Sequence, residues 1–274
     1  MGRELSGRVV AITGASSGIG AAAAVACARR GMRVGLFARR VGRLHEVAGE
    51  VREAGGEAEV VIGDVRDRQA VFALVEAVTR RWRRLDIMVA NAGFGIAAPV
   101  AETPPEEVRE IFDVNAIGTV WAIQAAWPIF EIERRGHLVL VSSGAALHGI
   151  PANALYSATK AAQRNLAEGL KVEAEAIGVD VSVILPIVTE TDFRRNLRDH
   201  TGGRRERADA RIGGPRQSSE EVAEAIVACL ASPKFEVYPY RPARLLPFLE
   251  AVSPALTERI LRYPEYYRRQ TGSK

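Results

Sequence analysis

A tyrosine and a lysine four residues apart, Tyr156 and Lys160, are the part of this sequence best suited to chemistry. Residues at this spacing lie on one face of a helix, one turn apart. A phenol has an ordinary pKa of about 10, and a neighbouring ammonium ion favours its ionised form. The pair is therefore suited to transfer a proton near neutral pH. The alternative is an exposed helical lysine beside a buried tyrosine, with no chemical role.

Lysine is rare in this chain, which makes its position informative. Lys and Arg together number 37 in 274 residues, and only four are Lys, at positions 160, 171, 234 and 274. A solvated helix face accepts arginine equally well, whereas a compact ammonium is not interchangeable with a planar guanidinium. This rarity favours a specific role for Lys160.

Hydrophobic strands alternate with helical patterns and predict the scaffold that positions the pair. Strands are expected at 9–13, 34–38, 59–62, 87–90, 138–141, 181–185 and 235–238. Helices are expected up to Gly31, at 41–54, 68–82 and 220–230, from Pro104 or Pro105 towards Phe130, and from Tyr156 to about Ile177. This alternation is typical of a parallel sheet covered on both faces. We expect an α/β, doubly wound Rossmann fold of about seven strands in three αβα layers.

Polar residues and a proline fall where successive strands end: Thr13, Arg39, Asp64, Asn91, Ser143 and Pro186. Each alone has an ordinary explanation as a turn or loop residue. Ligands of open parallel sheets bind at the carboxyl ends of the strands, so six such residues at one edge indicate a ligand site.

The turn after the first strand, TGASSGIG at 13–20, is glycine-rich and leads directly into a helix. Glycines allow backbone amides to approach a pyrophosphate, and a helix N-terminus favours anions. The motif therefore predicts a dinucleotide site. Cys27 and Cys229 lie far apart without other metal-binding residues nearby, so we expect buried thiols and no metal.

The composition is ordinary for a globular enzyme, with 47% hydrophobic and 26% charged residues. A net charge of +4 does not indicate nucleic-acid binding. We expect no signal peptide, and no apolar run in the sequence approaches the ~20 residues of a membrane span. We expect a cytoplasmic protein with no membrane span.

Together the motifs resemble those of the short-chain dehydrogenase/reductase (SDR) family across about residues 5–240. The matching pieces are TGASSGIG at 13–20, Asp64-Val65, Asn91-Ala92-Gly93, Asn115 in VNAIG, Ser143, and YSATK at 156–160. The resemblance implies an oxidoreductase that transfers a hydride between a nicotinamide cofactor and a carbonyl or secondary alcohol.

The resemblance also implies four catalytic roles. Tyr156 is the general acid/base, and Lys160 lowers its pKa and holds the nicotinamide ribose. Ser143 hydrogen-bonds the substrate oxygen, and Asn115 supports a water chain that reaches Lys160. A donor pair aimed at the substrate oxygen suits this reaction, because hydride transfer leaves oxyanion character there.

The expected cofactor-binding residues follow the same motifs. They are Gly14, Ser16, Ser17, Gly18, Ile19, Gly20, Arg39, Arg40, Asp64, Val65, Asn91, Ala92, Gly93, Tyr156, Lys160, Pro186 and Thr191. An NAD site typically has an acidic residue after the second strand, whereas residues 37–40 here include Arg39 and Arg40 and no acid. These arginines, with Ser16, can hold a 2′-phosphate. We predict a preference for NADP(H) over NAD(H).

The substrate side departs from the family. Ile187 follows Pro186 where the family usually has glycine, and isoleucine avoids the positive φ open to glycine. We therefore expect an altered nicotinamide pocket. The residues expected to meet substrate are Ser143, Tyr156, Phe94, His148 and Phe193, with Ile187 beside them, which favours an apolar carbonyl compound.

We expect one domain over 1–274, with a substrate lid at about 187–216 and a helical extension at about 242–274. Eight Arg between 193 and 216 either attract an acidic substrate or form an ordinary solvated loop. The family resemblance implies a homodimer or homotetramer. Two alternatives stay open: a catalytically silent dinucleotide-binding sensor or scaffold, and an epimerase or lyase, which usually carries a larger substrate domain.

Overall fold

A seven-stranded parallel sheet forms the centre of the computed structural model, which describes residues 2–190, 198–200, 216–253 and 255. Its order is β11-β7-β6-β4-β1-β2-β3, so the chain builds outward on both sides of β1 and β4. The strands are β1 (Val9–Thr13), β2 (Arg33–Ala38), β3 (Glu57–Ile62), β4 (Ile87–Ala90), β6 (Gly136–Val141), β7 (Val179–Ile184) and β11 (Glu236–Val237). The expected seven-stranded doubly wound fold is confirmed.

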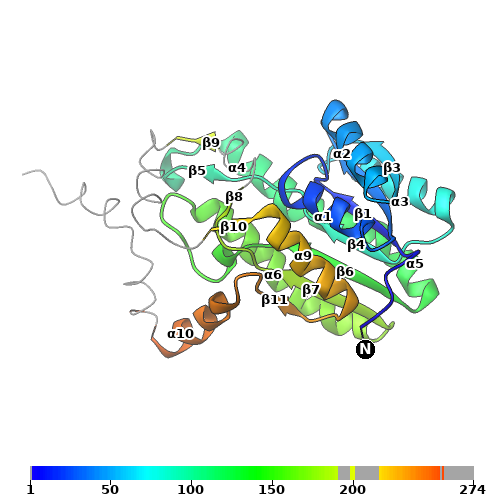
Figure 1. Cartoon of the computed structure of the whole chain (residues 1–274). Helices are drawn as coiled ribbons and strands as arrows, with labels where there is room; N and C mark the ends of the chain where they lie inside the picture. Colours follow the sequence, from blue (N-terminus) through cyan, green and yellow to red (C-terminus); the bar gives the residue numbers. More distant parts are fainter. Residues whose placement is uncertain (1, 191–197, 201–215, 254, 256–274) are drawn as a thin grey trace, which may run out of the picture.

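Helices cover both faces of this sheet (Figure 1). Strand residues alternate between the two faces, so Val10 and Ile12 join one core cluster while Val9 and Ala11 join the other. The first cluster packs against α1 (Gly18–Ala28), α2 (Val41–Glu53) and α9 (Ser219–Ala231). The second packs against α3 (Arg68–Trp82), α5 (Gly118–Glu133) and α6 (Ala154–Glu175).

Short elements lie towards one side of the molecule, and the chain begins on the other (Figure 1). Two-residue strands pair β5 (Ile96–Ala97) with β9 (Arg198–Asp199), and β8 (Thr189–Glu190) with β10 (Gln217–Ser218). The sequence analysis did not predict these pairs, because two residues carry no periodic pattern. The remaining short elements are η1 (Val100–Glu102), η3 (Gly144–Ala146), η4 (Arg241–Leu245) and α10 (Leu246–Val252).

The long helix expected from Pro104 or Pro105 towards Phe130 is wrong as one element. It is divided into α4 (Pro105–Phe112), a π-helical turn η2 (Asp113–Ile117) and α5. Only parts of the expected lid and extension lie within the described residues. Both cysteines are buried thiols, as expected, and none of the helices in the described ranges is long and apolar enough to cross a membrane.

Candidate functional site

The glycine-rich turn after β1 is pressed against the end of β4. Gly14 has φ +68°, and a Cβ there would lie 2.8 Å from the Ala92 Cα. A Cβ on Gly20, in the first turn of α1, would lie 2.4 Å from the Gly14 carbonyl oxygen. Only glycine fits at these two positions. The two glycines thus allow the turn to fold tightly in front of α1, and a glycine-rich turn leading into a helix N-terminus fits a pyrophosphate.

Hydrogen bonds of Thr13 join this turn to the residues that follow β4. Its Oγ1 accepts hydrogen bonds from the backbone nitrogens of Asn91 (3.0 Å) and Ala92 (3.2 Å). The Asn91 Nδ2 donates to the Thr13 carbonyl oxygen at 3.0 Å. Thr13 was recognised as a strand-end residue but was not among the expected cofactor residues. Its place as the first residue of the TGASSGIG motif was the available signal.

The arginines after β2 lie beside two other expected cofactor residues. Arg40 donates from Nε to the Ser16 Oγ at 3.3 Å and from Nη2 to the Ser16 carbonyl oxygen at 3.4 Å. Arg39 lies 3.6 Å from an Asp64 carboxylate oxygen. Burial alone would raise the pKa of Asp64, but hydrogen bonds and charge from Arg66 outweigh it and hold the pKa below its usual range. Asp64 therefore stays ionised among basic groups.

Lys160 lies inside the protein, only 4% exposed, which excludes an exposed helical lysine. Its Nζ donates to the Val141 carbonyl oxygen at 3.0 Å and to the Gln163 Oε1 at 2.9 Å. The same Nζ lies 5.7 Å from the centroid of the Tyr156 ring. Burial lowers the pKa of Lys160 from 10.5 to about 7. The spacing seen in the sequence therefore does bring phenol and ammonium together.

Asn115 lies in the π-helical turn and is fully buried. Its Nδ2 donates to the Phe94 carbonyl oxygen (2.9 Å) and to Thr159 Oγ1 (3.0 Å), and its Oδ1 accepts from the Phe94 nitrogen (3.0 Å). A Cβ on Gly93 would lie 3.1 Å from Asn115 Oδ1 and 3.3 Å from Lys160 Nζ. The Asn115 amide and the Lys160 ammonium therefore both lie beside Gly93.

Ser143 follows β6 and begins the helical turn η3, which packs against α6. Its Oγ accepts from the Ala145 nitrogen at 3.1 Å, so its hydroxyl proton is left to donate elsewhere. The next residue, Gly144, donates its N–H to the Pro186 carbonyl oxygen at 2.7 Å. This bond joins the ends of β6 and β7.

Ile187 does not adopt a left-handed backbone, which agrees with the expectation that isoleucine avoids positive φ. Its N–H donates to Gln217 Oε1 at 3.2 Å. Its Cγ2 lies 3.7 Å from where a Cβ on Gly144 would stand. An isoleucine side chain therefore stands beside the turn that follows Ser143.

Two of the aromatic residues expected to meet substrate, Phe94 and Tyr156, lie in the same small cluster. Phe94 and Tyr156 both pack on a small cluster around Ile96 and Ile111. The guanidinium of Arg198 lies 4.9 Å from the centroid of the Phe94 ring. His148 is half-buried in the segment between η3 and α6. Thr191 and Phe193 lie outside the described residues.

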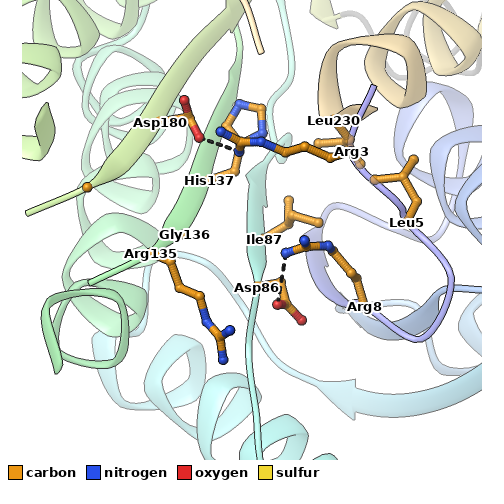
Figure 2. Close-up of a pocket in the computed structure, with 11 residues that line it drawn as sticks. Arg3, Leu5, Arg8, Asp86, Ile87, Arg135, Gly136, His137, Asp180 and Leu230 are labelled. Carbon is orange, nitrogen blue, oxygen red and sulfur yellow. Dashed lines mark hydrogen bonds and ion pairs between the residues drawn. The ribbon is translucent and has the colours of Figure 1, made fainter. Parts of the chain in front are cut away.

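A hollow of about 160 Å³ lies at the opposite edge of the sheet (Figure 2). Its lining includes residues at or just before the starts of β1, β4, β6 and β7, with Arg3 paired to Asp180 and Arg8 paired to Asp86. None of the expected site residues lines it. The converging polar groups at the carboxyl ends of the strands, not this hollow, define the candidate site.

Comparisons with known proteins point to one family. The family model described as short chain dehydrogenase matches residues 8–202. An uncharacterised oxidoreductase of Myxococcus xanthus is 39% identical over 183 residues, covering 67% of this chain and 72% of that protein. A short chain dehydrogenase/reductase of Burkholderia phymatum, solved with NAD, has a TM-score of 0.84 and 25% identity, covering 93% of this chain and 96% of its own. An alcohol dehydrogenase of Thermococcus sibiricus, solved with 5-hydroxy-NADP, has a TM-score of 0.73 and 29% identity, covering 84% and 95%.

Proposed function

The chain belongs to the short-chain dehydrogenase family, and from that premise we propose that it transfers a hydride between NADP(H) and a carbonyl or secondary alcohol. The observation that carries the proposal is the buried Lys160 ammonium, 5.7 Å from the Tyr156 ring. A cation placed there stabilises a phenolate and so makes Tyr156 a usable acid and base near neutral pH.

Each site residue has a separate role in the proposed hydride transfer. The nicotinamide supplies or accepts the hydride when the cofactor is bound. In reduction, Tyr156 Oη gives its proton to the substrate oxygen, and in oxidation the phenolate takes the proton from the alcohol. The Ser143 hydroxyl donates to the same oxygen and stabilises the charge that develops there. Asn115 and Gly93 keep the space beside Lys160 through which a water chain would replenish the proton.

The proposed preference for NADP(H) rests on charge. Arg39 and Arg40 follow β2, and Arg40 already lies on Ser16 in the glycine-rich turn. The solved relatives hold NAD in one case and 5-hydroxy-NADP in the other, so the fold accommodates either cofactor. A 2′-phosphate between two guanidinium groups gains charge-assisted hydrogen bonds that a ribose hydroxyl does not. Binding of NADH at least as tight as that of NADPH in a fluorescence titration would contradict this preference.

A kinetic test addresses the reaction itself. NADPH oxidation is followed against a panel of ketones and aldehydes, with wild-type protein and Tyr156→Phe. We expect Tyr156→Phe to lower kcat by roughly 10²–10⁴-fold while NADPH still binds, because the hydroxyl is the proton donor. Activity within twofold of wild type in this variant would remove Tyr156 from the mechanism. Wild-type protein that binds NADPH but oxidises it with none of these compounds would instead favour a dinucleotide-binding sensor.

A further inference from the structure

The Lys160 ammonium is held by two neutral oxygen acceptors. One is the Val141 carbonyl at the end of β6, and the other is the side-chain carbonyl of Gln163, three residues along the same helix. Burial lowers the pKa of Lys160, and no carboxylate among the described residues forms an ion pair with it. The charge is thus stabilised by hydrogen bonds rather than by an ion pair.

Gln163 is itself fixed in one orientation. It is 1% exposed, and its Nε2 donates to Thr119 Oγ1 of α5 at 2.7 Å. The Thr119 hydroxyl donates a hydrogen bond to the Asn115 backbone carbonyl oxygen at 2.8 Å. Because an ammonium only donates, the Gln163 oxygen must face Lys160 and the amide nitrogen must face Thr119. The hydrogen bonds therefore run without conflict from the ammonium to the π-helical turn.

We propose that Gln163 is a positioning residue that holds the Lys160 ammonium in place and preserves its charge without neutralising it. The inference rests on the proposed function, since the charge matters through Tyr156. A carboxylate at position 163 would also accept from Lys160, but its negative charge would cancel the field that favours the Tyr156 phenolate. An apolar side chain would leave a desolvated cation short of an acceptor. A neutral amide avoids both consequences.

The groups that face Lys160 come from three elements. Tyr156 and Gln163 lie on α6, and the Val141 carbonyl belongs to β6. The Asn115 amide belongs to η2, and Gly93 lies between it and Lys160. Among these groups only Tyr156 ionises, so the charge on Lys160 and the proton on Tyr156 are coupled. A change at Gln163 should therefore appear in two titrations, that of the lysine and that of catalysis.

The four lysines of the chain make a direct measurement possible. Protein labelled with ¹³C at lysine Cε gives four resonances to follow against pH by NMR, with Lys160 assigned from a Lys160→Met sample. We expect Gln163→Met, which keeps the side-chain length but removes the acceptor, to lower the Lys160 midpoint by about one pH unit. Gln163→Glu should raise it by a similar amount. Gln124→Met, at an exposed glutamine of α5, is the matched control and should leave it unchanged.

Catalysis supplies the second readout. In alcohol oxidation, the acid limb of kcat/KM should move to higher pH by about one unit in both Gln163→Met and Gln163→Glu, since each weakens the positive field at Tyr156. A residue needed only for packing would not shift the lysine in opposite directions in these two variants. Thr119→Val, which frees the Gln163 amide, should lower the Lys160 midpoint less, and it serves in place of Gln163→Met if that variant does not fold.

The outcomes separate the two proposals. An unchanged Lys160 midpoint in Gln163→Met, or in Thr119→Val where that variant takes its place, would overturn the role of Gln163 even in an active enzyme. Wild-type protein that binds NADPH but reduces no carbonyl compound would overturn the proposed function. The lysine titration would still decide whether Gln163 controls the charge of Lys160.

Discussion

At the scale of single residues, burial of the Lys160 ammonium lowers the stability of the folded protein. In an unfolded chain its ordinary pKa is 10.5, whereas in the folded protein the pKa is about 7. Between these values the unfolded chain binds the extra proton and the folded protein does not. Stability therefore rises with pH across that window, and burying the charge is most costly below pH 7. Burying Lys160 therefore lowers stability at neutral pH, as is common for residues with a chemical role.

Replacing this lysine should remove that pH dependence. Relative to Lys160→Met, wild-type protein should gain up to about 1.4 kcal/mol of unfolding free energy per pH unit between pH 7 and 10. The variant also leaves two acceptors unpaired, so the trend with pH is the informative quantity, not the absolute difference. Urea unfolding at pH 7, 8 and 9 measures it. A constant difference between the two proteins would show that Lys160 is not buried as a shifted base.

The small space beside Lys160 predicts a second residue effect. A methyl group on Gly93 would stand 3.1 Å from Asn115 Oδ1 and 3.3 Å from Lys160 Nζ, so both polar groups must give way. We expect Gly93→Ala to lower kcat/KM by at least about tenfold, because displaced catalytic groups lose their alignment. Gly49→Ala, where nothing lies within 4 Å of the added methyl, is the control and should keep full activity. Equal activity of both variants would mean that the space has no function.

At the scale of elements, the strands and most helices were predictable, and the π-helical turn was not. The Val-rich strands and the helix over Arg68–Trp82 follow directly from their hydrophobic patterns. The turn at Asp113–Ile117 depends on contacts distant in sequence: Asn115 bonds the Phe94 backbone, and a Cβ on Gly118 would meet the Val65 side chain at 2.9 Å. No local pattern encodes such contacts.

Helix α9 offers a test of local signals. Ser218 accepts from the Glu221 nitrogen at 3.0 Å, and the Glu221 carboxylate accepts from the Ser218 nitrogen at 2.8 Å, which completes a capping box. Ser218→Ala should lower the unfolding free energy by about 1 kcal/mol, because one helix-end N–H loses its partner. Glu220→Gln, next to the box, should change it far less. Equal losses, measured by urea unfolding, would mean that the cap contributes nothing specific.

At the scale of the whole molecule, the candidate site residues gather at one edge because all seven strands of the sheet run in the same direction. Ser143 was expected from this rule, Tyr156 and Lys160 from their spacing on a helix, and Asn115 from the family resemblance. Sequence reasoning missed Gln163 and Thr119, whose roles depend on how α5 and α6 pack. The i,i+3 spacing of Lys160 and Gln163 was a usable signal, but many helical polar pairs share it.

The effect of cofactor binding on the stability of the whole molecule should depend on the charges of Arg39 and Arg40. A ligand that binds only the folded state stabilises it by mass action, by about 2.7 kcal/mol at a hundred times its Kd. At equal concentrations NADP⁺ should therefore raise Tm more than NAD⁺. Arg39→Ala combined with Arg40→Ala should remove the difference, whereas Arg43→Ala, at an exposed residue paired with Glu46 on α2, should keep it. The extra shift should shrink at 1 M salt, where charges are screened within about 3 Å. Equal shifts for both cofactors in wild-type protein would show that these arginines do not select the phosphate.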